Sequence, residues 1–191
     1  MSMNIPWGSP HATQFVTNVG LITSRGPHGD NVMAAEWTHH VSYEPGLIAV
    51  CIGHGKATLQ NIEATKVFGV SLAASEQNWI ASIAGSSHGN EVDKVTALRE
   101  LGVSFTPAKK VDVLLVQGAL TQFECHVLQL IPLGDHTMVV GEVVEMHEIA
   151  EGKQPLVYHG LKFWNLGSAL EKPAADVIKK IDAAVEKYRK K

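Results

Sequence analysis

Short apolar runs separated by polar turns fill the first 73 residues of the chain. Runs of this length that are bounded by glycine, proline, asparagine and aspartate are typical of β-strands. Glycines and prolines mark polar turns at 25–30 and at 45–46, where the chain is expected to reverse. The pattern therefore predicts four strands, at residues 15–24, 31–41, 47–52 and 67–73.

Three short helices are expected after the third strand. Thr58 can cap a helix over 59–65, because its hydroxyl accepts a hydrogen bond from a free amide of the first turn. A second short helix is predicted to begin at Ser75. A third has helical spacing of apolar residues over 93–101, and Gly102 stands where a glycine commonly ends a helix.

Strand-like sequence resumes at residue 111 and predicts two or three antiparallel strands. Leu133, Gly134 and Asp135 form the expected hairpin turn, and 155–159 reads as a final short strand. Many closely spaced strands, few helices and no alternation of strands with helices indicate a mainly β fold. We therefore predict an antiparallel barrel rather than a Rossmann-like sheet.

A C-terminal amphipathic helix is predicted over 173–190. Pro173 suits the first helical position, where its missing amide hydrogen costs nothing. Apolar residues repeat along one face at Val177, Ile178, Ile181, Ala184, Val185 and Tyr188. We expect this face to dock on the same chain or on a partner subunit.

The chain as a whole is expected to form one domain over 1–191, with its core at about 10–167.

Composition and charge exclude several classes of protein. The 191 residues are 45% hydrophobic and 18% charged, with a net charge of −3. This balance offers no basic surface for nucleic acid. No apolar run is long enough to span a membrane, and the N-terminus lacks the features of a signal peptide. We expect a cytoplasmic protein, in which Cys51 and Cys125 are buried free thiols.

Histidine and cysteine patterns give little support to metal or nucleophilic chemistry. His39 and His40 are adjacent, and adjacent strand residues point to opposite faces, so they cannot bind one metal ion. The ten histidines form no HxH or HExxH pattern, and no nucleophile elbow, a GxSxG turn from a strand into a helix, is predicted. We therefore assign no metal ligand and no catalytic side chain. A metal-binding or hydrolytic protein on the same barrel stays open as an alternative.

Two stretches, 34–38 and 51–58, suit the binding of a flat cofactor better than metal or nucleophilic chemistry. Small residues let backbone amides approach a ring, and hydroxyl or ammonium groups can bind its phosphate. An alternative role for Thr58 is to cap the helix without contacting a cofactor. The candidate residues of the two stretches are Ala34, Ala35, Glu36, Trp37, Thr38, Cys51, Ile52, Gly53, Lys56 and Thr58.

The order of several sequence blocks resembles the flavin reductase-like family of FMN-binding split barrels, especially its flavoredoxin-type and ferric-reductase-like members. The blocks are VGLITSRGPHGDNVMAAEW, VSYEPGLIAVCIG, KATLQNIEATKVFGVSL, DK at 93–94, GDHTMVVGEV at 134–143 and PLVYHGLKFWNLG at 155–167. Together they span most of 10–167. The resemblance implies an antiparallel Greek-key split barrel that forms a homodimer and binds FMN near the subunit interface.

The resemblance also implies roles for individual residues. Asn31 and Trp37 would lie beside the flavin, and Thr58 would hold its phosphate end. Lys94 would approach the cofactor from the middle of the chain. The residues by themselves also allow structural roles, which are core packing for Trp37 and a place on a helix surface for Lys94.

His136 and Phe163 would line the nicotinamide side of the flavin if the resemblance holds. His136 lies in a Gly-Asp-His turn and by itself also suits a purely structural turn position. Trp164 neighbours Phe163 and is an alternative counterpart for it.

The implied activity is an NAD(P)H:flavin oxidoreductase, which passes electrons from NAD(P)H through FMN to an acceptor. The alternative is a flavoredoxin-type electron carrier that binds FMN, receives electrons from a protein partner and has little NAD(P)H activity. In that case the basic C-terminal helix is a candidate docking surface for the partner.

Overall fold

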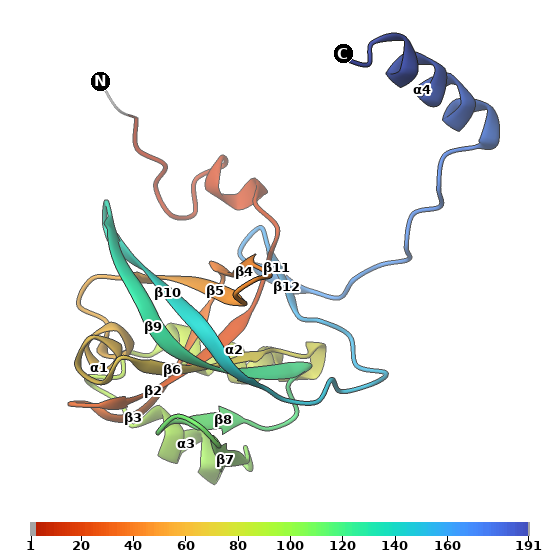
Figure 1. Cartoon of the computed structure of the whole chain (residues 1–191). Coiled ribbons are helices and arrows are strands. Elements are labelled where there is room, and N and C mark those ends of the chain that lie inside the picture. Colours follow the sequence, from red (N-terminus) through yellow and green to blue (C-terminus); the bar gives the residue numbers. More distant parts are fainter. Residues whose placement is uncertain (1–2, 191) are drawn as a thin grey trace.

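A seven-stranded antiparallel sheet curls into a barrel in the computed structural model, which describes residues 3–190 (Figure 1). The strands follow one another in the order β3-β2-β6-β9-β10-β5-β4. This confirms the predicted mainly β, antiparallel split barrel. The strands are β2 (Gly20–Gly26), β3 (Gly29–Ala35), β4 (Thr38–Ser42), β5 (Leu47–Gly53), β6 (Val67–Leu72), β9 (Thr121–Leu133) and β10 (His136–Met146).

Two hairpins form at the turns that the sequence predicts. In the first, Gly26 pairs with Gly29 across a two-residue turn. In the second, Leu133 pairs with His136, and Gly134 adopts a φ of 58° that favours glycine. The turn residues therefore fix the register of both strand pairs.

The predicted strand at 31–41 is wrong as a single element. The chain leaves the sheet at Glu36 and Trp37, so that β3 ends before them and β4 begins after them. These two strands are the opposite edges of the seven-stranded sheet, and a continuous strand cannot join opposite edges. His39 and His40 also do not alternate between inside and outside. Both are exposed on the edge strand β4, with ring centroids 4.6 Å apart.

Five short strands flank the barrel within the described residues. β7 (Phe105–Pro107) pairs with β8 (Leu114–Val116), while β11 (Val157–His159) pairs with both β1 (Thr17–Asn18) and β12 (Lys162–Trp164). The predicted strand at 15–24 is thus divided between β1 and β2, which belong to different sheets. The sequence analysis found the strand at 155–159 but missed β12.

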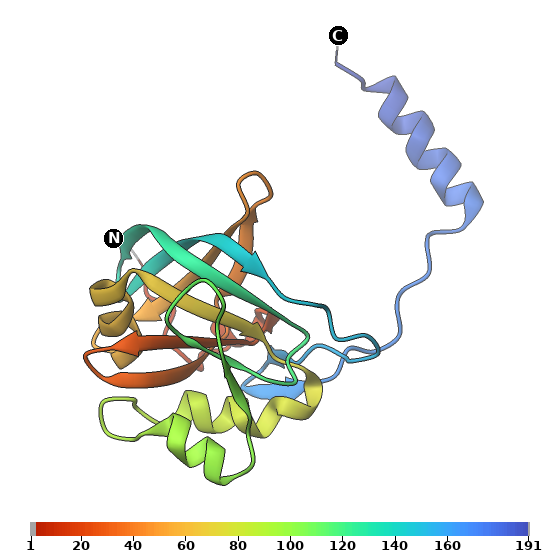
Figure 2. The same cartoon turned by 60° about the horizontal axis from the view of Figure 1, so that its bottom comes forward.

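Helices cover one end and one side of the barrel. They are η1 (Ala12–Gln14), α1 (Ala57–Thr65), η2 (Ser75–Gln77), α2 (Asn78–Ser86) and α3 (Lys94–Glu100). Figure 2 shows α2 and α3 side by side along the barrel wall. The predicted N-cap was wrong for α1: Lys56 is the cap residue, and Thr58 lies buried within the first turn. The third predicted helix is confirmed, because Asp93 caps α3 and Gly102 follows it with a φ of 88°.

Two hydrophobic clusters form the core. One fills the barrel around Ile22, Val50 and Phe68, and includes Cys125, which is a buried free thiol as predicted. The other lies between the barrel and the helices α2 and α3. A side chain at Gly141 would meet the Phe68 ring at 2.4 Å, so this glycine permits the close packing of the first cluster.

The C-terminal helix α4 (Ala175–Lys187) projects away from the barrel in both views (Figures 1 and 2). It begins two residues later than predicted, with Ala174 as its cap, so Pro173 precedes the helix. None of its residues is buried, and therefore it does not dock on the described part of its own chain. Within residues 3–190, no helix combines the length and the apolar character required to cross a membrane.

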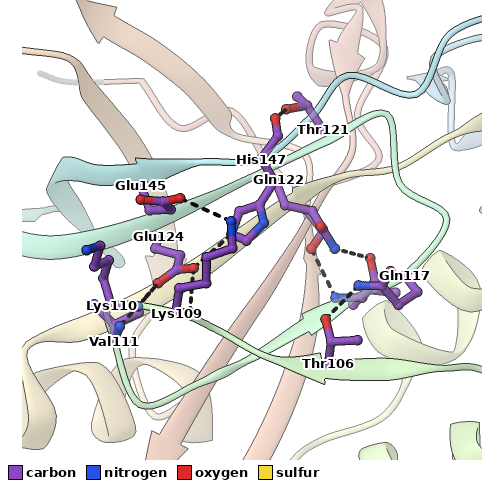
Figure 3. A network of polar contacts seen from close by, with 12 residues as sticks. Thr106, Lys109, Lys110, Val111, Gln117, Thr121, Gln122, Glu124, Glu145 and His147 are labelled. Atoms are coloured by element: carbon purple, nitrogen blue, oxygen red, sulfur yellow. Dashed lines mark hydrogen bonds and ion pairs between the residues drawn. The ribbon is translucent and has the colours of Figure 1, made fainter.

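A buried carboxylate ties the 108–112 loop to the barrel wall (Figure 3). Glu124 of β9 is fully buried, and its oxygens accept hydrogen bonds from the backbone amides of Lys109, Lys110 and Val111 at 2.6–3.1 Å. His147 Nε2 lies 2.8 Å from Glu124 Oε1. Burial alone raises the pKa of Glu124, but these hydrogen bonds outweigh it and hold the pKa below the usual 4.5.

We expect Glu124→Gln to lower the free energy of unfolding at pH 7 by about 2–3 kcal/mol, since three amides lose a charged acceptor. Urea unfolding measures this value. Glu145→Gln, which removes only a partly exposed ion pair with Lys109, is the matched control and should cost under about 1 kcal/mol.

The same contact predicts a pH dependence. A carboxyl group whose pKa is lower in the folded state stabilises the fold above its unfolded pKa of about 4.5 and loses this effect as the pH falls. The difference in the free energy of unfolding between wild type and Glu124→Gln should therefore become smaller below about pH 4.5. A difference that stays constant down to pH 3 would show that Glu124 does not carry a stabilising charge.

Candidate functional site

A cleft of about 500 Å³ opens where β3, β5 and the first turn of α1 meet the loop between α2 and α3. The turn before β10 and the N-terminal segment close its other sides. One end of the cleft is polar and cationic, and the other end is aromatic and apolar. The two ends therefore suit different parts of a ligand.

The polar end is built around the contact between β3 and α1. Asn31 Nδ2 donates a hydrogen bond to Thr58 Oγ1 at 2.7 Å, and both side chains are buried. The amides of the first turn of a helix have no partners within the helix. Among the described residues, no side chain caps those of α1. Ala57 and Thr58 thus bring unpaired amides and a hydroxyl to the cleft wall, an arrangement that favours an anion.

A buried lysine adds positive charge at this end. Lys94 is 2% exposed, and its Nζ donates to the carbonyl oxygens of Ala84 at 3.0 Å and Ser87 at 3.3 Å. The ion pairs within residues 3–190 do not include it. Burial, and then the nearby charge of Lys56, lower the pKa of Lys94 from 10.5 to about 8. An anionic ligand in the cleft would supply the missing counter-charge.

The loop after α2 lies across the polar end. His88 Nδ1 is 3.3 Å from Lys56 Nζ, which links this loop to the start of α1. Gly89 approaches Asn31 so closely that a side chain there would meet Asn31 Oδ1 at 2.3 Å. A glycine at 89 is therefore needed for the loop to close against β3.

The aromatic end centres on Trp37 and His136, whose ring centroids are 4.7 Å apart. His136 Nδ1 lies 2.7 Å from Asp135 Oδ1, and this contact holds the imidazole in place. Glu36 also faces the cleft, where burial raises the pKa of its carboxyl group and the charge of His136 partly offsets the rise. Tyr158 completes this end.

The N-terminal segment forms a wall that the sequence analysis missed. Trp7, Phe15 and Leu161 line the cleft beside Tyr158. The segment is tied to the β11–β12 turn by a hydrogen bond from the amide of Gly160 to the carbonyl of Thr13 at 3.3 Å. Trp7 and Leu161 lie outside the predicted strands, and Phe15 begins the predicted strand at 15–24, so no pattern in the sequence indicates that the three lie together.

Most of the predicted site residues come together in the cleft. Its lining includes Asn31, Ala34, Ala35, Glu36, Trp37, Cys51, Gly53, Lys56, Thr58, Lys94 and His136. Cys51, which was expected to be buried, is only partly so, because its side chain faces this opening. Their binding of a cofactor stays a prediction.

Three predicted site residues do not line the cleft. Ile52 points into the barrel core because its neighbours Cys51 and Gly53 face the cleft and strand residues alternate. Thr38 is buried and donates to the carbonyl of Ala35 at 3.1 Å. Phe163 packs against the Tyr158 ring at 5.4 Å, behind the cleft wall.

The comparisons with known proteins agree with this architecture. The model of the flavin reductase like domain matches residues 12–167. The chain belongs to the flavin reductase-like family. Among residues 3–190, no three histidine, cysteine, aspartate or glutamate side chains gather in a group able to hold a metal ion.

Several known proteins are similar to this chain. An NADH-dependent flavin reductase of Rhodococcus sp. is 29% identical over 160 residues, which are 80% of this chain and 81% of that protein. An uncharacterized protein of Pyrococcus abyssi is 33% identical over 133 residues, 67% of this chain and 74% of its own. The structure of BorF, the flavin reductase component of a bacterial two-component tryptophan halogenase, has a TM-score of 0.72 and 27% identity, covering 82% of this chain and 94% of that one.

The buried charge of Lys94 predicts a pH-dependent stability for the ligand-free protein. Its folded pKa of about 8 is below 10.5, so the folded state binds fewer protons between these values and stability should rise across this range. Lys94→Met, of similar length and without charge, should raise the free energy of unfolding at pH 7 by about 2 kcal/mol.

Urea unfolding of both proteins at pH 7 and pH 10 provides the measurement. The advantage of Lys94→Met should shrink at pH 10, where the folded wild type carries a neutral amine. If Lys94→Met changes the free energy of unfolding equally at the two pH values, the charge of Lys94 does not destabilise the folded protein.

Proposed function

We propose that this protein is a flavin reductase, which uses NADH to reduce FMN bound in the cleft and passes the electrons to an acceptor. The observation that carries the proposal is the pairing, in one cleft, of an uncapped helix start and buried cation with an aromatic end. The activities named for relatives such as the Rhodococcus flavin reductase support it.

The polar end fits the phosphate of FMN. The amides of Ala57 and Thr58, together with the Thr58 hydroxyl, offer hydrogen-bond donors to phosphate oxygens. Asn31 donates to that hydroxyl and thereby leaves its hydrogen free for the ligand. Lys56 and Lys94 supply positive charge, and the phosphate provides a counter-charge for Lys94, which forms no ion pair within residues 3–190.

The rest of the cleft fits a flat ring. Ala34, Ala35 and Gly53 are small residues, so a ring can lie close to the backbone of the cleft wall. Trp37 lies beside His136 at the far end. When bound, the flavin supplies the ability to accept a hydride from nicotinamide and to release electrons. The protein contributes orientation and electrostatics, so the absence of an assigned catalytic side chain suits this activity.

The positive charge near the site has a further role in the proposal. Lys94 is held rigidly by two carbonyl groups in a region shielded from water, where a charge acts strongly. The charge of Lys94 therefore stabilises a bound ligand more strongly when that ligand carries more negative charge. Its removal should weaken FMN binding and make the potential of bound flavin more negative.

We further propose that the protein forms a homodimer. The unpartnered apolar face of α4, with Ile181 50% and Val185 60% exposed, supports this, because such a face is normally covered. Sedimentation equilibrium of the full chain should give twice the chain mass of 20.6 kDa. The mass of one chain at micromolar concentration would contradict it.

The direct test of the reductase proposal is anaerobic. Purified protein is mixed with FMN and NADH, and the flavin absorbance near the visible maximum is followed. Bleaching much faster than that of free FMN with NADH is expected. Bound flavin that stays yellow with both NADH and NADPH would contradict the reductase and favour the electron carrier that a protein partner reduces.

The phosphate position predicts a selective defect. Thr58→Val removes the hydroxyl but keeps the shape, so FMN affinity should fall about tenfold. Riboflavin, which has no phosphate, should bind wild type and Thr58→Val equally. Thr58→Ser keeps the hydroxyl and is the matched control. If Thr58→Val weakens the binding of FMN and riboflavin equally in a fluorescence titration, the phosphate does not bind at Thr58.

A further inference from the structure

Three large apolar side chains that line the cleft are widely exposed. They are Trp7, Phe15 and Leu161, which are 78%, 66% and 45% exposed, and we call them the N-terminal wall. Each contributes little to the stability of the fold, because so much of its surface stays in water. Exposed apolar side chains that gather at one cavity commonly mark a binding site. A ligand therefore explains their position better than packing does.

A hydrogen-bonded turn fixes the position of Trp7. The amide of Ser9 donates to the carbonyl of Pro6 at 3.0 Å, and Gly8 has a φ of 75°. A left-handed glycine at the third position fits a type II turn, with Trp7 at the second position. A side-chain carbon added at Gly8 would lie 3.8 Å from Leu161 Cδ1. The turn thus holds Trp7 beside Leu161.

The segment that precedes β1 is attached to the β11–β12 hairpin. Figure 1 shows this segment (red) entering the fold beside β11, with which β1 pairs. The carbonyl of Phe15 lies 3.4 Å from His159 Nδ1, and the amide of Gly160 donates to the carbonyl of Thr13 at 3.3 Å. The N-terminal wall is therefore anchored at the cleft and is not a free terminus.

Leu161 has a strained backbone at the place where it meets the cleft. His159 pairs with Lys162 across a two-residue turn, in which Gly160 and Leu161 have φ values of 57° and 61°. Glycine and asparagine favour these left-handed conformations, whereas the side chain of leucine makes them costly. Strained residues of this kind cluster at active sites and ligand-binding sites. Leu161 thus presents an apolar group to the cleft at a cost in stability.

Lys66 is the other non-glycine residue with a positive φ in the described part of the chain, and its φ is also 61°. The conformation of Lys66 has a local explanation. It caps the C-terminus of α1, and its amide donates to the carbonyl of Ile62 at 2.8 Å. The turn at Leu161 caps no helix, so this explanation does not apply there. The comparison favours a ligand as the reason for a leucine at 161.

We propose that Trp7 and Leu161 cover the ring of the bound flavin and keep the flavin in the protein from one turnover to the next. This inference rests on the proposed flavin site. Asn31 and Thr58 hold the phosphate end by hydrogen bonds, and the N-terminal wall adds apolar contact at the ring end, so release requires both ends to detach.

Retention of the flavin decides how electrons leave the protein. Affinity differences between similar sites lie mostly in the dissociation rate, and the opening of a covered site often limits release. With FMN retained, electrons leave through an acceptor that enters the cleft. They do not leave with reduced FMN that diffuses to another protein.

The test measures how fast bound FMN exchanges. Protein loaded with isotopically labelled FMN is mixed with excess unlabelled FMN, NADH and ferricyanide, and the label that stays bound is measured after rapid gel filtration. Wild type should oxidise many NADH molecules for each FMN that it releases. One release for each NADH oxidised would overturn the inference and leave the proposed reductase intact. If FMN does not bind, or NADH does not reduce it, the proposed function itself fails.

Trp7→Ala should release labelled FMN about tenfold faster than wild type in the absence of NADH, because the ring loses its contact with the indole. Trp79→Ala is the matched control, since Trp79 is an exposed tryptophan of α2 outside the cleft. The control should release FMN at the wild-type rate. Equal release rates in Trp7→Ala and wild type would contradict the proposed contact.

Leu161→Gly separates contact with the flavin from a role in the fold. It should release FMN about fivefold faster, while its urea midpoint should equal or exceed that of wild type, because glycine adopts the left-handed conformation without strain. Lys66→Gly relieves the same conformation outside the cleft and should leave FMN release unchanged. An unchanged release rate or a lower midpoint in Leu161→Gly would assign Leu161 to the fold and overturn the inference.

Discussion

The ammonium group of Lys94 lies inside the protein with two backbone carbonyl groups and no carboxylate among the described residues to balance it. A buried charge of this kind is costly, and its depressed pKa of about 8 expresses that cost. The loop between α2 and α3 closes around it, and the uncapped start of α1 adds unpaired amides nearby. These features make sense together if an anionic ligand completes the site.

The barrel topology decides where this charge can act. β3 and β4 are opposite edges of the seven-stranded sheet, and the chain passes between them through Glu36 and Trp37. The crossing places an acid and an indole at one end of the cleft, while α1 begins at the other end. Charge and aromatic surface are thereby held apart on rigid elements, which suits a ligand with a phosphate and a flat ring.

The sequence predicts best those features that depend on local chemistry. Turn glycines locate the β2–β3 and β9–β10 hairpins, and Asp93 with Gly102 bounds α3, because these residues act on their own backbone. The family resemblance supplied Asn31, Lys94 and His136 before the structure brought them to one cleft. Their joint placement depends on contacts between distant strands, which no local pattern reveals.

The incorrect predictions have tertiary causes. The strand at 31–41 has continuous strand-like sequence, but its ends belong to opposite sheet edges. Thr58 is a good capping residue, yet the helix starts at Ala57, two residues earlier than predicted, and the Thr58 hydroxyl accepts a hydrogen bond from Asn31. The cleft wall formed by Trp7, Phe15 and Leu161, which was missed, is assembled from segments far apart in the chain.

A crystal structure of the protein grown with FMN would show where the flavin phosphate lies. We expect the flavin phosphate within about 3 Å of the Thr58 hydroxyl and of the first amides of α1, with the ring extending toward Trp37 and His136. A flavin bound outside this cleft, or one reversed so that its phosphate lies beside Trp37, would contradict the proposed site.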